Sequence, residues 1–437
     1  MGTSPSASGV DQRPSAPVSQ RILAARTGVA FVFGLNGLAL GSWFARVPAA
    51  RDAFDLSAGR MGLLLLALSA GSLLALPLAG AVVHRLGSAR SVRVAAGMVA
   101  VGLTVIGLTV GGWTWIPAVA LGLFGLGFSS GICEVAMNVE GAAVERLLGR
   151  NVMPRFHAAW SLGTVGGALI GAGSVRIGLP IAVHLAIVAV VVAAGAAGAV
   201  RSFLPTASAS PTDAERADHP DGAGDPHGTD RVEGPDGVTR RRGSGALAAW
   251  REPRTVLIGL LVLVMAFTEG TANDWVALAF VDGHAVTETV GAVAYGVFVA
   301  AMTLGRTTGT VALDRWGRIP VLLATIVLAA AGVVIAVLAS PWPVALVGVV
   351  LWGLGASLGF PVGMSAAADQ QERAAARVSV VSAIGYTAFL AGPPLVGLLG
   401  DWLDSVLRAL LVVPLLLIPA LFLVPTARPP ADDRAAD

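Results

Sequence analysis

The sequence has no lysine, a single cysteine and few charged residues, which make up 13% of its 437 residues. The lone Cys133 excludes an internal disulfide framework. Soluble globular chains carry about a quarter of their residues as charged side chains, so the shortage of charge excludes that class. The arginines lie in alternate loops between apolar segments, and this distribution gives no indication of nucleic-acid binding despite a pI of about 9.3.

Apolar residues are abundant instead, at 55% of the chain. They recur in blocks of about 20 residues, the length that an α-helix needs to cross a hydrocarbon core. The blocks are continuously apolar rather than alternating, which excludes a transmembrane barrel. We therefore predict an all-α polytopic membrane protein with twelve transmembrane helices arranged as two six-helix repeats. The predicted spans are 24–46, 60–83, 92–111, 115–140, 157–177, 180–203, 255–281, 290–313, 319–339, 343–367, 378–400 and 405–424.

Polar segments divide the chain into five parts. Residues 1–23 are rich in Ser, Pro and Ala and have no apolar core, which predicts a disordered tail rather than a signal peptide. Residues 24–204 and 253–425 hold the two predicted helix bundles. Between them, 205–252 is rich in Asp, Pro, Gly and Arg and cannot bury enough apolar surface to fold, so we expect a flexible linker. A polar tail, 426–437, closes the chain.

The arginines predict the orientation in the membrane. They cluster in the loops after spans 2, 4, 8 and 10 and are sparse in the opposite loops. Because basic loops face the cytoplasm, both termini and the linker are expected there, in a bacterial inner membrane. The clustered residues are Arg85, Arg90, Arg93, Arg146, Arg150, Arg155, Arg315, Arg318, Arg373 and Arg377.

Two motifs recur in both halves. The turn after span 2 reads His84-Arg85-Leu86-Gly87, and the turn after span 8 reads Asp314-Arg315-Trp316-Gly317. Span 4 contains Phe124-Gly125-Leu126-Gly127, and span 10 contains Trp352-Gly353-Leu354-Gly355. Duplicated six-helix halves are typical of transporters that rock around a central site.

These residues resemble the major facilitator superfamily, whose signature after spans 2 and 8 is Asp-Arg-x-Gly with basic residues beyond. The second copy matches it with Asp314 and Arg315, whereas His84 replaces the aspartate in the first copy. In that family the turn latches the cytoplasmic ends of neighbouring helices. The resemblance therefore implies gating roles for Arg85, Asp314 and Arg315, with the first latch lacking its carboxylate.

A narrower resemblance is to the fucose-permease-related branch, and within it to MosC-like permeases. It implies proton symport of sugars. Drug–proton antiporters of the superfamily carry Gly-Pro in span 5, but 163–171 has no proline and the pair occurs as Gly392-Pro393 in span 11, which disfavours that alternative. The narrower resemblance is carried by Asn36-Gly37, Trp43-Phe44-Ala45-Arg46-Val47-Pro48, Met137-Asn138, Phe156-His157, Glu269-Gly270 and Asp274-Trp275.

Polar side chains share helix faces within three predicted spans. A carboxyl group in a lipid-compatible helix is costly, so it faces an aqueous cavity or a partner. We expect Glu134 or Glu269 to carry a proton, and the asparagines and Trp43 to contact the substrate. The pairs are Asn36 and Trp43 on span 1, Glu134 and Asn138 on span 4, and Glu269 and Asn273 on span 7.

Other charged residues are expected at gates. Asp274 lies toward the outer end of span 7, where it either pairs with Arg46 of span 1 as a periplasmic gate or contacts substrate. His157 opens span 5 and is expected at the inner gate. Glu134 lies ~28 Å along its helix at ~1.5 Å per residue, which indicates a proton or gating group on the inward side. The alternative is a structural ion pair between Glu134 and a neighbouring helix, for instance through Arg306 of span 8.

We therefore expect a secondary transporter that moves a small polar, sugar-like solute by alternating access and proton symport. Its expected partners are the solute, protons and the bilayer, with no nucleic acid, cofactor or metal, and it is expected to act as a monomer. The alternatives are an exporter or drug–proton antiporter of the same fold and a non-transporting membrane sensor. An enzyme is disfavoured because no zinc, Ser/Lys or paired-Asp motif occurs, and His219 and His227 are too loosely placed for a metal site.

Overall fold

A computed structural model describes residues 20–113, 115–149, 152–204, 249–369 and 373–429. Most of the predicted tails and linker, with His219 and His227, lie outside these ranges. Twelve helices are long and apolar enough to cross a membrane, and the described residues contain no strand. The predicted all-α architecture with twelve spans is confirmed.

The N-terminal half contributes six spans, with a short helix after the first and a π-helical turn after the third. Its elements are α1 (Gln20–Phe44), α2 (Val47–Ala53), α3 (Ala58–Leu86), α4 (Ser88–Leu108), η1 (Thr109–Trp113), α5 (Ile116–Leu148), α6 (Met153–Arg176), α7 (Ile181–Ala199) and η2 (Val200–Ser202).

The C-terminal half also contributes six spans, of which the fourth is divided into α13 and α14 and the sixth into α16 and α17. Its elements are α10 (Pro253–Gly283), α11 (Glu288–Trp316), α12 (Arg318–Leu338), α13 (Trp342–Ala356), α14 (Gly359–Ala367), α15 (Ala374–Trp402), α16 (Val406–Ala409), α17 (Val412–Leu423) and η4 (Val424–Ala427).

The helices run past the apolar windows from which the spans were predicted. Span 4 was expected to end at residue 140, but α5 continues to Leu148 through Glu145 and Arg146. Charged residues end a hydropathy window without ending a helix, because Glu and Arg are good helix formers. The polar ends of these helices therefore project beyond the hydrocarbon core.

The repeat extends to backbone conformation. Gly87 and Gly317 follow α3 and α11, the second spans of the two halves, and have φ of 76° and 77°. Only glycine adopts this left-handed region at little cost, so the sequence motif produces a tight turn in both halves. Asp55 and Ala285, which each lie three positions before the first residue of the same two helices, also share positive φ, at 48° and 51°.

Glycines bring helices into backbone contact within the N-terminal half. A Cβ added at Gly163 of α6 would lie 2.0 Å from the carbonyl oxygen of Gly34 on α1. One added at Gly127 of α5 would lie 2.0 Å from the carbonyl oxygen of Leu68 on α3. Larger residues at these positions would force the helices apart.

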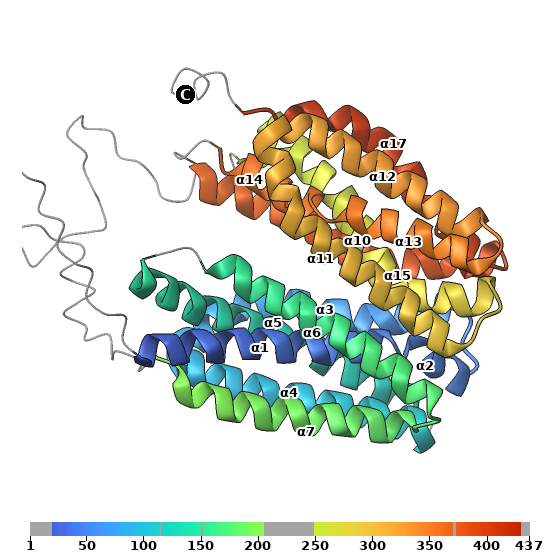
Figure 1. Cartoon of the computed structure of the whole chain (residues 1–437), viewed down its shortest axis with the longest axis horizontal. Coiled ribbons are helices and arrows are strands. Elements are labelled where there is room, and N and C mark those ends of the chain that lie inside the picture. Colours follow the sequence, from blue (N-terminus) through green and yellow to red (C-terminus); the bar gives the residue numbers. More distant parts are fainter. Residues whose placement is uncertain (1–19, 114, 150–151, 205–248, 370–372, 430–437) are drawn as a thin grey trace, which may run out of the picture.

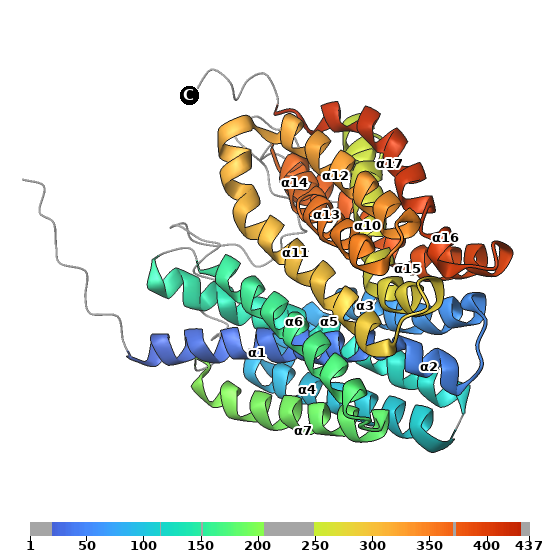
Figure 2. The ribbon, with the colours of Figure 1, turned by 45° about the vertical axis from the view of Figure 1, so that its right-hand side comes forward.

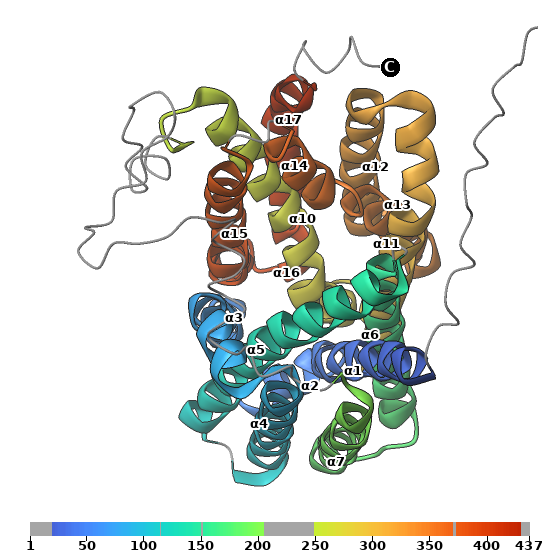
Figure 3. The ribbon, with the colours of Figure 1, turned by 90° about the vertical axis from the view of Figure 1, so that its left-hand side faces the viewer.

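The two halves lie one above the other in Figure 1 and meet mainly where α3 packs on α15 and α6 packs on α11. We call the end at which α1 and α10 begin the linker end, and the opposite end, where α2 lies, the closed end. The ribbons of the halves diverge toward the linker end (Figures 1 and 2). Viewed along the helices, α5 and α1 lie on the side of the N-terminal half that faces α10 (Figure 3).

Candidate functional site

The C-terminal half contains an ion pair inside its helix bundle. Arg306 Nη2 on α11 lies 2.7 Å from Glu269 Oε2 on α10, and the two side chains are 32% and 12% exposed. Arg306 Nε also donates a 3.3 Å hydrogen bond to the carbonyl oxygen of Ser357. The structural alternative for Glu134 is therefore wrong in this conformation, because Arg306 pairs with Glu269 instead.

Ser357 is available to Arg306 because the tenth span is broken there. The sequence predicted one helix over 343–367, but α13 ends at Ala356 and α14 begins at Gly359. The Ser357 hydroxyl donates to the carbonyl of Leu354 at 2.6 Å, a bond that competes with the helical ladder. A break frees carbonyl groups that need other donors inside a membrane, and Arg306 supplies one.

Glu134 has a different environment. Its side chain on α5 is exposed, and its carboxylate forms no hydrogen bond or ion pair with any described residue. Asn138, one turn later, donates from Nδ2 to the backbone carbonyl of Glu134 at 2.8 Å. The face that they share is thus formed as predicted, with the carboxylate left free.

A row of aromatic side chains lies on the C-terminal half. Tyr386 of α15 lies 6.0 Å from Phe360 of α14 and 6.2 Å from Phe389 of α15, measured between ring centroids. All three residues are partly exposed. Glu134 acts electrostatically on the Tyr386 hydroxyl, so the free carboxylate of one half lies near the aromatic row of the other.

Asn36 connects two helices rather than standing free. Its Oδ1 accepts a 3.0 Å hydrogen bond from the hydroxyl of Ser130 on α5, and its side chain is buried. Asn273 is partly buried on α10 and shares the predicted face with Glu269. Sequence reasoning missed Ser130, whose position one turn before Glu134 was the available signal.

The predicted periplasmic gate is not formed as expected. Asp274 and Arg46 are both buried, but they form no ion pair with each other. The carboxylate that acts electrostatically on Arg46 is Glu288 of α11. Trp43 is fully buried and its indole N–H has no hydrogen-bond partner, so in this conformation it cannot reach a solute that enters from the linker end.

Different residues join the halves at the closed end. Arg51 Nη2 of α2 lies 2.5 Å from Asp282 Oδ1 of α10, and Arg51 Nε lies 2.7 Å from Asp52 Oδ1. The hydroxyl of Ser57, the N-cap of α3, donates to Asp401 Oδ2 of α15 at 2.9 Å. These contacts escaped the sequence prediction, although Asp52 and Asp282 occupy equivalent positions of the repeat.

The predicted gating residues at the linker end are exposed. His157 of α6 contacts Phe33 of α1 edge-on, with ring centroids 5.2 Å apart, and Arg306 acts on it electrostatically. Arg85, Asp314 and Arg315 form no ion pair with any described residue, and the Arg315 guanidinium lies over Trp316 at 5.6 Å. The motif residues are thus free at the end where the ribbons diverge.

Each half also has an acid that ties its own helices together at this end. Asp369 accepts from Arg318 at 2.7 Å and from Arg254 at 3.0 Å. Glu140 of α5 accepts from the backbone N–H of Leu204 at 2.7 Å. Glu140 lies beyond Glu134 on the fourth span of the N-terminal half, and Asp369 directly follows the fourth span of the C-terminal half. Each acid bonds to residues at the end of another span of its own half.

Glu252, just before α10, connects that helix to the start of α15. It pairs with Arg377 Nε at 2.5 Å and with Arg373 Nη1 at 3.2 Å. The hydrogen bond from Arg377 lowers the pKa of this carboxyl below its usual value, against the opposing effect of partial burial. Glu252 is therefore held as a carboxylate at neutral pH.

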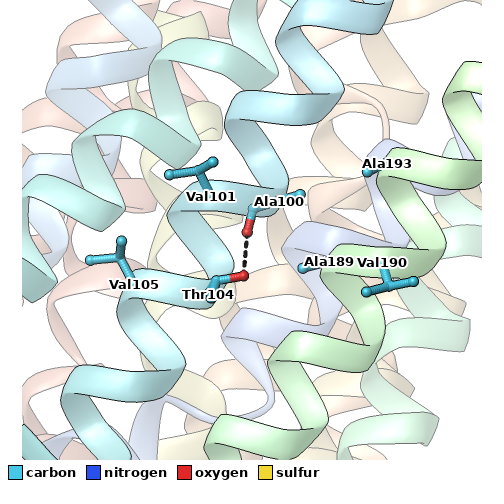
Figure 4. Close-up of a pocket in the computed structure, with 7 residues that line it drawn as sticks. All are labelled: Ala100, Val101, Thr104, Val105, Ala189, Val190 and Ala193. Carbon is cyan, nitrogen blue, oxygen red and sulfur yellow. Dashed lines mark hydrogen bonds between the residues drawn. The ribbon is translucent and has the colours of Figure 1, made fainter.

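A surface groove lies away from all of these residues. It runs between α4 and α7 on the outside of the N-terminal half and has a volume of about 290 Å³ (Figure 4). Its only hydroxyl, that of Thr104, donates to the carbonyl of Ala100 at 2.8 Å. An apolar groove without a free polar group cannot select a polar solute. Its lining residues are Ala100, Val101, Thr104, Val105, Ala189, Val190 and Ala193.

No group of three or more His, Cys, Asp or Glu side chains within the described ranges could hold a metal ion. Cys133 is free and buried beside Glu134. The side chains described above therefore offer carboxylates, arginines, amides and aromatic rings.

Comparison with known proteins connects this geometry to a family. The model of the Major Facilitator Superfamily matches residues 258–437. The chain is 32% identical over 384 residues to an uncharacterized transporter, y4wD, of Sinorhizobium fredii, covering 87% of this chain and 93% of that protein. It is 30% identical over 393 residues to an uncharacterized MFS-type transporter of Yersinia pestis, covering 88% and 91% of the two chains.

The MosC-like resemblance is confirmed. Membrane protein MosC of Rhizobium meliloti is 27% identical over 380 residues, covering 86% of this chain and 83% of MosC.

Solved structures share the fold. The nucleoside transporter NupG superposes with a TM-score of 0.70 at 13% identity, over 92% of this chain and 99% of NupG. A D-xylose-proton symporter gives a TM-score of 0.69 at 13% identity, over 92% and 97% of the two chains. The fucose:proton symporter FucP of E. coli gives 0.56 at 15% identity, over 93% and 99%. At these low sequence identities, the structural similarity supports a shared fold and nothing further.

Proposed function

Since this chain belongs to the major facilitator superfamily and is a multi-pass transporter rather than an enzyme, we propose that it moves a small polar, sugar-like solute by proton-coupled symport. It acts as a monomer in a bacterial inner membrane, with both termini in the cytoplasm. The arginine-rich loops at the linker end support this orientation.

The observation that carries the proposal is the free carboxylate of Glu134. It lies inside a membrane-spanning helix, is exposed, and has no counter-ion among the described residues, whereas Glu269 is paired with Arg306. An acid without a fixed counter-ion is easily protonated in a poorly hydrated cavity. We therefore assign Glu134 as the primary proton carrier and Glu269 as the coupling partner, which Arg306 holds in an ion pair.

The aromatic row supports a solute that contains a ring. Tyr386, Phe360 and Phe389 present aromatic faces, while Glu134 and Asn138 offer a carboxylate and an amide oxygen for hydroxyl groups. Hydroxylated rings are the cargo named for the similar structures, a nucleoside transporter and the D-xylose and fucose proton symporters. Asn36, Asn273 and Trp43 complete the proposed site when the halves rearrange.

Alternating access then proceeds between two gates. With the closed end shut, solute and proton exchange at the linker end, next to His157. When the linker end closes, Arg85, Asp314 and Arg315 gain partners, and Arg46 and Asp274 are hydrated at the opening outer side. Arg46 and Asp274 are both buried and form no ion pair with any described residue, which supports this assignment, because burying an ionisable side chain without a partner is costly unless another state relieves it.

Transport by purified protein in proteoliposomes tests the proposal. A thermal-shift screen against sugars, inositols and nucleosides first selects a solute, since a ligand that binds the folded state raises its apparent stability. Accumulation driven by an inward-directed proton gradient is then measured. Glu134→Gln should abolish gradient-driven accumulation while retaining solute exchange, and Glu269→Gln should weaken both. If both variants kept gradient-driven accumulation intact, the proton-carrier assignment would be wrong.

A proton-coupled exporter is the second candidate, and one observation favours it. A free carboxylate beside a row of aromatic rings is also suited to an organic cation through cation–π attraction. In that case the same liposomes should expel tetraphenylphosphonium against its gradient, and sugars should leave the melting temperature unchanged.

A further inference from the structure

The repeat places two aspartates at equivalent positions next to the closed end. Asp52 and Asp282 each precede by three positions a residue with positive φ, Asp55 in the first half and Ala285 in the second. Both aspartates therefore lie six residues before the first residue of the second span of their half.

One arginine serves both carboxylates. Arg51 bonds Asp52 of its own half through Nε and Asp282 of the other half through Nη2. The repeat equivalent of Arg51 is Val281, so the second copy brings no cation of its own. Arg51 and Asp282 are each 26% exposed, whereas Asp52 is 52% exposed. The inter-half pair is thus the more protected of the two.

The surrounding helices are already in contact. A Cβ added at Gly62 of α3 would lie 2.4 Å from the carbonyl oxygen of Pro393 on α15, and one at Gly397 would lie 2.4 Å from that of Ala58. Ser57 and Asp401 add a hydrogen bond at the same crossing. The closed end is therefore held by close helix packing, one hydroxyl–carboxylate bond and one inter-half ion pair.

We propose that Arg51 is the latch of the closed end and that it changes partners during the transport cycle. While the closed end is shut, Arg51 bridges Asp52 and Asp282; when the halves separate there, it keeps Asp52 and releases Asp282. The idea rests on the alternating access of the proposed function, but on neither the solute nor the proton.

Asp52 lowers the cost of releasing Asp282 from Arg51. Breaking an ion pair normally leaves two charges to be solvated, which is the costly part of separating a partly buried pair. Here Arg51 retains a carboxylate in both states, so only Asp282 needs water when the closed end opens. Asp52 and Asp282 also act on each other as like charges, so without Arg51 they would repel.

Spin-label distances in the full-length protein in lipid nanodiscs test this directly. In a Cys133→Ala background, one label pair replaces Leu86 and Trp316, the exposed last residues of α3 and α11 at the linker end. A second pair replaces Trp113 and Trp342, exposed residues of opposite halves at the closed end. The populations of long and short distances give the ratio of the two states without any ligand.

The variants should separate in a fixed order. Asp282→Asn should shift the ratio roughly fivefold toward opening of the closed end, the size expected for a partly exposed pair. Arg51→Gln should shift it further, because two unscreened carboxylates then face each other. Asp52→Asn, the matched control, should shift it in the opposite direction or leave it within about twofold. In Arg51→Gln with Asp282→Asn, the ratio should return to that of Asp282→Asn alone.

Two results would overturn the proposal. Unchanged distances in both Asp282→Asn and Arg51→Gln would show that helix packing alone holds the closed end. Equal shifts from Asp52→Asn and Asp282→Asn in the same direction would show that Arg51 does not distinguish its partners. Because no solute or proton gradient is used, failure of the symport proposal leaves this test intact.

Discussion

The two halves share a backbone plan but differ in how they hold charge. Within the C-terminal half, five ion pairs connect Glu269, Asp369 and Glu252 to arginines. In the N-terminal half, Glu134 has no counter-ion among the described residues, and Glu140 bonds to a backbone N–H. Duplication thus preserved helix positions and turns, while the charges diverged.

This difference supports distinct tasks for the two halves in the proposed mechanism. A carboxylate with a fixed arginine partner stays ionised and holds helices in place, whereas a carboxylate with no partner is free to exchange protons. The broken tenth span follows the same division, because Arg306 supports its freed carbonyl while the equivalent fourth span stays continuous. In the proposed mechanism, the C-terminal half would act as the fixed frame and the N-terminal half would carry the exchangeable proton.

The largest loss of stability is expected from removing the charge of Arg306 in the C-terminal half. Arg306→Gln leaves Glu269 without its partner and the Ser357 carbonyl without a side-chain donor. Loss of one partner of a buried pair costs roughly 3–5 kcal/mol, and the partial exposure of Arg306 lowers our expectation to about 2 kcal/mol. We expect a melting temperature lower by several degrees and loss of transport, measured by thermal unfolding in detergent and by liposome uptake.

A double variant separates the two consequences. Glu269→Gln combined with Arg306→Gln removes both charges, so most of the lost stability should return while transport stays lost. Arg306→Lys keeps the charge but not the fork that reaches Ser357, and should be intermediate. If Arg306→Gln were as stable as the wild-type protein, the ion pair would not support the broken span.

Much of the fold was predictable, because membrane spans are set by length and apolarity. Span number and repeat follow from twelve apolar blocks and from the Gly87 and Gly317 turns, which the structure confirms. The break at Ser357 was not predictable from hydropathy, since both flanking helices are apolar. It depends on Arg306 reaching across from another helix, which is a tertiary contact.

The candidate site shows the same limit. Spacing along one helix correctly placed Glu134 and Asn138 on one face, because that relation is local. The partners of Arg306 and Arg46 depend on helix crossing and were assigned wrongly. Arg51 and Asp282 are far apart in sequence and meet only because the halves close at that end.

The next effect in size compares the two acids at the linker end. Asp369 is 7% exposed and holds two partly exposed arginines, so Asp369→Asn should cost about 1.5 kcal/mol. Glu140→Gln keeps an oxygen that can accept from Leu204 N–H, so its cost should stay below about 1 kcal/mol. Thermal unfolding of the two variants at equal ionic strength measures the difference. Equal losses would show that the two halves hold their linker ends with similar strength after all.

The smallest effect is expected from Glu252 and depends on pH. Hydrogen bonding from Arg377 depresses the pKa of Glu252 in the folded protein, so its stabilisation is complete above the unfolded value of about 4.3. The stabilisation is lost as pH falls through the folded pKa, since the protonated acid no longer attracts Arg377 and Arg373. Glu252→Gln should therefore unfold at a lower temperature than the wild type at pH 7. We expect its free energy of unfolding to be lower by less than about 1 kcal/mol.

The difference in stability between the wild type and Glu252→Gln should disappear at acidic pH and become smaller at high salt. Thr255→Val removes the 3.0 Å hydrogen bond that the uncharged Thr255 hydroxyl donates to the same carboxylate. The difference in stability between the wild type and this variant should not change with salt. Glu252 pairs with arginines whereas Glu140 accepts from an uncharged backbone N–H, so of these two contacts the salt-sensitive one belongs to the C-terminal half. If the difference in stability between the wild type and Glu252→Gln stayed constant from neutral to acidic pH, the charge of Glu252 would not stabilise the protein. Packing would then be the cause of the difference.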